Sequence, residues 1–334
     1  MASTRLKTSL TEPPSNLKEA IDWILRVSGK DGQHYGSTFA GLIDAVKERL
    51  KEKNVPELQN YTAETEKLKS YLQGITGWYG ESGRTSNMSA GDLLFGLAWE
   101  LADTLAERLA DLMGYKERSN GIANMMEKKY KSSYSSDATW EHKWRPDTEE
   151  AKKCAENFMT SVMLIYPLLT ELYWQCRPDS GPWKAQQMDG KSTGTDLKDF
   201  LTTKAGFDLD ELNTDGKPDP AKNSRITPRP TKGSTIASKL RTVFPEFKSV
   251  DSTSTFDDFL KKLTENAKGD KDIQKYPLTI LYLVASSYLN ATAPSVLHNI
   301  LKTIAGVTAV GAGATAAWYT QLFGLAPFLT TLVT

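Results

Sequence analysis

Residues Ala90–Met113 read AGDLLFGLAWELADTLAERLADLM, and this stretch decides the fold class. Its leucines recur every three or four residues, which places them on one face of a helix, with acidic residues on the opposite face. Gly114 follows directly, and glycine commonly ends a helix. We therefore predict a helix over Ala90–Met113. We interpret its leucine stripe as core, with a partner-binding face as the alternative; the stripe consists of Leu94, Leu97, Leu101, Leu105, Leu109 and Leu112.

The same helical periodicity extends outward in both directions along the chain. Asn16 followed three residues later by Glu19 is a variant of the capping box, so we predict that a helix begins here. A helix over 276–289 is apolar on all sides, which favours a buried, central position. No alternating strand pattern competes, and the predicted fold is all-α, a multi-helix, bundle-like domain. Further helices are predicted over residues 38–53, 64–75, 147–176 and 255–267.

Changes in polarity divide the chain into three parts. Residues 1–15 form a polar N-terminal arm, residues 16–300 a helical domain, and residues 301–334 a hydrophobic C-terminal segment. Within the helical domain, residues of about 116–148 and 177–234 are polar and lack periodicity, so we predict two long loops there. Loops of this length are uncommon in compact domains and are usually functional or disordered.

The C-terminal segment carries no charged residue after Lys302. A helix crosses a bilayer with about 20 apolar residues, so a membrane helix over roughly 304–323 is one interpretation. Trp318 and Tyr319 would then lie at the membrane interface. The alternative is a helical hairpin packed on the core, which the many Gly, Ala and Thr residues favour.

Composition narrows the function class. The chain has 334 residues, with 41 basic and 41 acidic side chains and a formal net charge of zero. A nucleic-acid binder normally has a clear basic excess, so we expect no nucleic-acid partner. The two cysteines, Cys154 and Cys176, fall in one predicted helix about 33 Å apart, too far for a disulfide bond.

The sequence contains no motif that predicts a catalytic, cofactor-binding or metal site. His34, His142 and His298 are scattered, and none has a second ligand at the spacing of a zinc site. Carboxylates are numerous, but no pair is placed for acid–base catalysis. We therefore expect a non-enzymatic protein without a cofactor. Candidate glycosylation sequons, about as many as chance gives, begin at Asn60, Asn87 and Asn290.

Three passages of the sequence together indicate a family. The first is Pro13–Val27 (PPSNLKEAIDWILRV) followed by GKDG at 29–32. The second is LYWQC at 172–176 with GPW at 181–183, and the third is FDDFL at 256–260 with PLTILY at 277–282. These passages resemble the variant erythrocyte surface antigen family of Babesia, an apicomplexan parasite of red blood cells.

The resemblance implies a non-enzymatic antigen at the membrane surface of the infected erythrocyte, with roles in antigenic variation and cytoadhesion. The implied partners are a host cell-surface receptor or an antibody, and a homo- or hetero-oligomer stays open. Typical members are longer and have a cysteine- and lysine-rich region, whereas this chain has two cysteines, as in a short or truncated relative. The alternative is an intracellular helical scaffold or partner-binding protein of the parasite that uses the Leu94–Leu112 face.

Overall fold

The computed structural model describes residues 6–30, 39–52, 90–113, 132–141, 143–186, 196–207, 232–250, 255–269 and 275–307. Within these ranges the chain is helical and contains no strand, and one isolated bridge pairs Lys7 with Tyr134. The prediction of an all-α fold is confirmed. The α-helices are α1 Leu17–Val27, α2 Phe39–Glu52, α4 Ala90–Met113, α5 Glu149–Cys176, α6 Asp196–Asp199, α8 Gly233–Val243, α9 Phe256–Gly269, α10 Pro277–Thr292 and α11 Pro294–Val307. A π-helix, η3, covers Phe200–Lys204, and a 3-10 helix, η4, covers Pro245–Val250.

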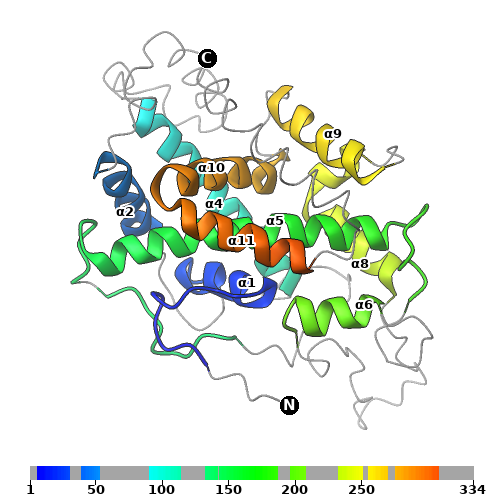
Figure 1. Ribbon diagram of the computed structural model, residues 1–334, viewed down its shortest axis with the longest axis horizontal. Coiled ribbons are helices and arrows are strands. Elements are labelled where there is room, and N and C mark those ends of the chain that lie inside the picture. Colours follow the sequence, from blue (N-terminus) through cyan, green and yellow to red (C-terminus); the bar gives the residue numbers. More distant parts are fainter. Residues whose placement is uncertain are drawn as a thin grey trace.

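Helix α5 is the axis of the fold, and α1, α2, α8, α10 and α11 all pack against it (Figure 1). The side chain of Thr148 caps it by accepting a hydrogen bond from the Ala151 amide, at 3.3 Å. It continues through Pro167 for 28 residues, about 42 Å at 1.5 Å per residue. Cys154 and Cys176 are both buried on it and free, as the sequence predicts.

Helix α10 is buried as predicted, but the central position belongs to α5. Helix α10 packs on α5 and α4, and its Tyr282 ring stacks on Tyr166 of α5 with centroids 4.3 Å apart. The sequence predicts a central position for α10 because this helix is more uniformly apolar than α5. Helix α5 takes the axis because its length lets five other helices pack along it.

Helix α4 has the bounds that the sequence predicts. Leu101, Leu105, Leu109 and Leu112 are all at most 3% exposed, and they belong to the hydrophobic core. The side chains of the first two leucines of the stripe fall outside the described residues. Over its described half the leucine stripe is therefore core, as interpreted from the sequence.

The N-terminal arm is folded onto the domain from residue 6 onward. Lys7 and the segment around Tyr134 exchange backbone hydrogen bonds: the Lys7 amide donates to Ser133, and the Ser135 amide donates to Lys7. Leu10 is buried, and so are Tyr134, Ala138 and Trp144 in the second segment. Part of the predicted polar arm and part of the predicted loop over 116–148 therefore cover the core.

The predicted polar stretch 177–234 also contains ordered, buried structure. Residues 177–186 form turns that bury Trp183, and α6 with η3 buries Leu197, Phe200 and Leu201. This short helical segment escapes detection because its apolar residues span a single turn. The sequence likewise does not predict helices α8 and α11 as separate elements.

Helix α11 carries the chain across the predicted boundary at residue 301 and ends at Val307. Residues 308–334 lie outside the described residues, as does the predicted helix over 64–75. Among the residues that the structure describes, no helix combines the length and apolar character that crossing a membrane requires.

Candidate functional site

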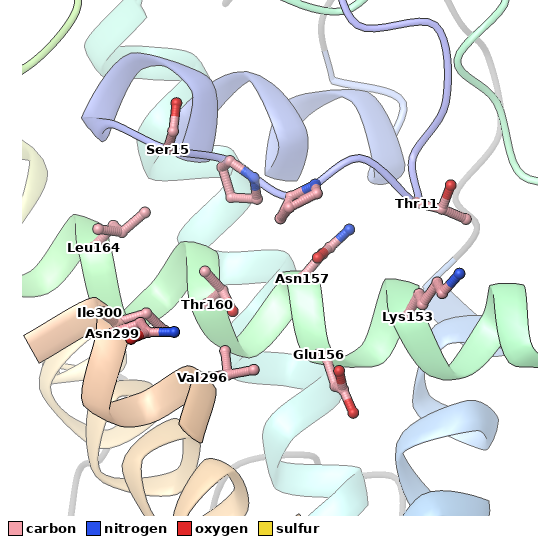
Figure 2. Close-up of a pocket in the computed structure, with 12 residues that line it drawn as sticks. Thr11, Ser15, Lys153, Glu156, Asn157, Thr160, Leu164, Val296, Asn299 and Ile300 are labelled. Atoms are coloured by element: carbon pink, nitrogen blue, oxygen red, sulfur yellow. The ribbon is translucent and has the colours of Figure 1, made fainter. Parts of the chain in front are cut away.

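A groove of about 480 Å³ lies along α5, between the N-terminal arm and α11 (Figure 2). Side chains of α5 at a helical spacing form its floor, the arm forms one wall, and the first half of α11 forms the other. One end of the groove is apolar and contains Leu164 and Ile300. The other end is charged and contains Lys153 and Glu156. Its lining residues are Thr11, Pro13, Pro14, Ser15, Lys153, Glu156, Asn157, Thr160, Leu164, Val296, Asn299 and Ile300.

The proline wall of the groove is anchored before and after the two prolines. Before them, the Leu10 carbonyl accepts hydrogen bonds from Trp23 Nε1 and from Asn157 Nδ2, each at 2.9 Å. After them, the amide and hydroxyl of Ser15 donate to the Glu19 carboxylate at 2.8 and 2.7 Å. Burial alone would raise the pKa of Glu19, but the hydrogen bonds from Ser15 and Lys7 outweigh burial and lower it.

These contacts modify the capping box that the sequence predicts. The Asn16 side chain accepts a hydrogen bond from the Glu19 amide at 2.9 Å, as expected for a helix N-cap. The Glu19 carboxylate, however, reaches back to Ser15 rather than to the Asn16 amide. The carboxylate of the capping box thus binds the residue before the N-cap. This contact links the N-terminal arm to α1.

The charged end of the groove is formed by Glu156 and Lys153. Glu156 forms an ion pair with Arg49 of α2, with Oε1 and Nη2 3.1 Å apart, and Lys153 is exposed at the rim. The remaining polar groups of the groove are hydroxyl and amide groups. Such a surface can bind a partner through hydrogen bonds and apolar contact.

Two buried carboxylates, Glu171 and Glu246, lie in the core and are not among the groove's lining residues. Burial raises the pKa of each to about 7, and hydrogen bonds from Gln175 and Thr279 respectively offset part of that effect. No sequence motif identifies these two carboxylates. The available signal was a lone carboxylate within an apolar run, LLTELYW for Glu171 and VFPEF for Glu246.

Three charged residues of the first family-like passage, Lys18, Asp22 and Arg26, form contacts inside the fold. Lys18 and Asp22 form a buried ion pair at 3.0 Å, and Asp22 also accepts a hydrogen bond from the Ser133 amide at 2.7 Å. Arg26 donates to the backbone carbonyls of Tyr134 and Ser135. Helix α1 is buried along its whole length because these contacts satisfy its charges.

The other two family-like passages pack against each other. Trp174 of α5 lies against Phe256 and Phe259 of α9, with ring centroids 5.5 and 5.3 Å apart. Tyr173 stacks near Phe259 at 5.8 Å. In the turn after α5, a Cβ on Gly181 would lie 2.4 Å from the Gln175 carbonyl, so the turn requires glycine.

Most of the candidate site residues predicted from the sequence lie outside the described residues: Asn60, Asn87, Trp318 and Tyr319. Asn290 lies in the last turn of α10. The hydroxyl of its sequon partner, Thr292, is buried and donates to the Tyr288 carbonyl at 2.8 Å. Across the described ranges, no group of three or more His, Cys, Asp or Glu side chains could hold a metal ion.

Comparison with known proteins identifies no relative of this chain. No protein-family model, no curated protein and no solved structure matches the chain. The groove, the buried carboxylates and the packed family-like passages are therefore the features on which a function can be argued.

Proposed function

We propose that this chain is a non-enzymatic antigen of the infected erythrocyte, similar in role to the variant erythrocyte surface antigens of Babesia. It would be exposed to antibodies and would bind a host cell-surface receptor. The observation that carries the proposal is the position of the family-like residues. The aromatic and aliphatic ones whose side chains are described, such as Trp23, Tyr173 and Phe259, are buried in one core around α5, whereas several of the others, such as Pro13 and Asp258, are exposed.

A division between core and surface is what an antigen under antibody selection needs. Shared residues maintain the fold, and exposed residues can change at little cost in stability. The polar stretch 177–234 contributes buried anchors such as Trp183, and between them it is rich in Pro, Asp, Lys and Thr. Together with the rim of the groove around Lys153, this stretch would supply the recognised surface.

The alternative, an intracellular scaffold that uses the leucine face of α4, is less well supported. Leu101, Leu105, Leu109 and Leu112 already contact other core residues. A partner helix could reach them only by displacing part of the hydrophobic core, at a cost of several kcal/mol for each exposed leucine pair. The groove along α5 offers a surface that needs no such rearrangement.

Labelling of intact infected erythrocytes tests the proposal. One antibody is raised against a peptide of residues 208–231, and a control antibody against residues 157–170 of the buried α5. We expect the first antibody to label intact cells and the second to label only permeabilised, denatured cells. If the first antibody also requires permeabilisation, the surface proposal is wrong and the intracellular alternative is favoured.

A further inference from the structure

The floor of the groove along α5 contains a buried hydroxyl group, that of Thr160. This residue is 6% exposed, and Figure 2 shows its side chain directed toward Val296 of α11. Two other buried hydroxyls of α5, on Ser161 and Thr170, each donate to the carbonyl four residues earlier. The Thr160 hydroxyl makes no hydrogen bond with any residue that the structure describes. It is therefore available to a ligand in the groove.

Two further polar side chains of α5 face the same groove. Asn157 is 6% exposed, and its Nδ2 donates to the Leu10 carbonyl at 2.9 Å, which fixes the side chain and leaves its oxygen as an acceptor. Lys153 is exposed at the charged end and has no ion pair within the described ranges, whereas the nearby Glu156 is paired with α2. The groove thus offers an acceptor, a hydroxyl group and, at one end, a positive charge.

The length and polarity of the groove favour an extended peptide as its ligand. Leu164 follows Lys153 by 11 positions on α5, which is about 16 Å at 1.5 Å per residue. An extended peptide advances about 3.3 Å per residue, so about five residues span that distance. A hydrocarbon chain would cover Thr160 and Asn157 without hydrogen bonds, at a cost in free energy. A peptide backbone has a donor and an acceptor in nearly every residue and can satisfy both side chains.

We propose that the groove binds an extended peptide segment of a partner protein. The peptide places a large apolar side chain against Leu164 and Ile300, and an acidic side chain about five residues away at Lys153. Between these two positions, its backbone donates to Asn157 Oδ1 and accepts from Thr160 Oγ1. This inference rests on the proposed function, in which the rim of the groove belongs to the recognised surface and the peptide to the receptor.

Selection of random peptides displayed on phage, with the full-length chain as bait, tests the charge contact. We expect the selected peptides to share an aspartate or glutamate about five positions from a large apolar residue. On Lys153→Glu, the selected peptides should carry lysine or arginine at the acidic position. Lys262→Glu is the matched control, because it reverses an exposed lysine of α9 that does not line the groove. It should select the same peptides as the natural chain.

Thr160→Val tests the contact on the floor with a side chain of nearly the same shape. A selected peptide, synthesised with a fluorescent label, should bind this variant about fivefold more weakly, because one hydrogen bond is lost. Thr202→Val is the control, since it removes a hydroxyl of η3 that already donates to the Lys198 carbonyl, and the affinity should not change. Fluorescence anisotropy measures the three affinities.

Three results would overturn the peptide site: no selected peptide, an unchanged selection on Lys153→Glu, or equal affinities for the natural chain and Thr160→Val. If no peptide is selected but dodecanoate binds in the groove, the groove is assigned to an acyl chain instead. Purified protein is used throughout, so these outcomes are separate from antibody labelling of intact cells. Labelling without peptide binding would keep the proposed function and reject the peptide site, and peptide binding without labelling would do the reverse.

Discussion

The Glu171 side chain makes the stability of the fold depend on pH. It is fully buried on α5, its Oε1 accepts a hydrogen bond from Gln175 at 2.7 Å, and burial raises its pKa to about 7. Folding therefore favours the protonated form, and this contribution is lost as the pH rises from the ordinary value of 4.5 to about 7. We expect Glu171→Gln to raise the free energy of unfolding at pH 8 by up to about 3 kcal/mol, with little change at pH 4.5. Urea unfolding at the two pH values measures the difference, and the control is Glu265→Gln, which changes an exposed carboxylate of α9.

Gly206 supports the start of α1 from a distant part of the chain. Its φ is +83°, and a Cβ there would lie 2.5 Å from the side chain of Asn16, the N-cap of α1. Gly206→Ala should cost about 2 kcal/mol, because it adds left-handed backbone strain to displacement of the cap. Gly29→Ala is the matched control: it also has a positive φ, of 67°, but it follows the other end of α1. Thermal unfolding of both variants should show the larger loss for Gly206, and equal losses would contradict the role of the cap contact.

Helix α1 holds the arm and the segment 132–136 through its own charged side chains. Arg26→Met should lower the free energy of unfolding by about 2–3 kcal/mol, because the carbonyls of Tyr134 and Ser135 lose a buried charged donor. Lys30→Met, just beyond the same helix, is the control, since its ion pairs with Asp103 and Glu107 are solvent-exposed and should contribute less than about 1 kcal/mol. Chemical unfolding of the two variants gives both values. A loss at Arg26 no larger than at Lys30 would mean that the segment is held by apolar contacts alone.

The helices that the sequence predicts correctly are those with sustained periodicity. Ala90–Met113 appears with its predicted bounds, and α1 begins after the predicted cap. The sequence does not predict α6 and η3, because Leu197, Phe200 and Leu201 form too short an apolar pattern; their burial depends on tertiary contacts such as that between Phe200 and Trp183. The groove could not be predicted either. It depends on Pro13, Thr160 and Val296 meeting, and no local pattern relates three segments so far apart.

At the scale of the whole molecule, one helix organises the candidate sites. The groove lies along one face of α5, Glu171 is a buried residue of the same helix, and Trp174 near the end of α5 contacts α9. Changes that shift α5 should therefore affect the groove and the core together, whereas changes at the groove rim should affect recognition alone. The apolar residues around α5 are constrained by packing, whereas exposed residues can change at little cost in stability.

Removal of residues 308–334 separates the two interpretations of the charge-free C-terminal segment. The described helix α11 ends at Val307, so a chain that ends there contains the residues of every described helix. If the segment anchors the protein in a membrane, we expect the truncated protein to keep its far-UV circular dichroism and cooperative unfolding. It should lose only its resistance to extraction from membranes at alkaline pH. A truncated protein without cooperative unfolding would instead assign the segment to the core.

A charge placed within the full-length chain provides a second, independent test of the anchor. Ala312→Arg puts a charge near the centre of the candidate membrane helix over 304–323, where insertion of arginine costs about 2.5–3.5 kcal/mol. Thr330→Arg is the matched control, because it adds the same charge beyond the predicted span. Membrane association should fall in the first variant and persist in the second. Equal association in both would contradict a spanning helix, because only burial in hydrocarbon makes the cost of a charge depend so strongly on its position along the segment.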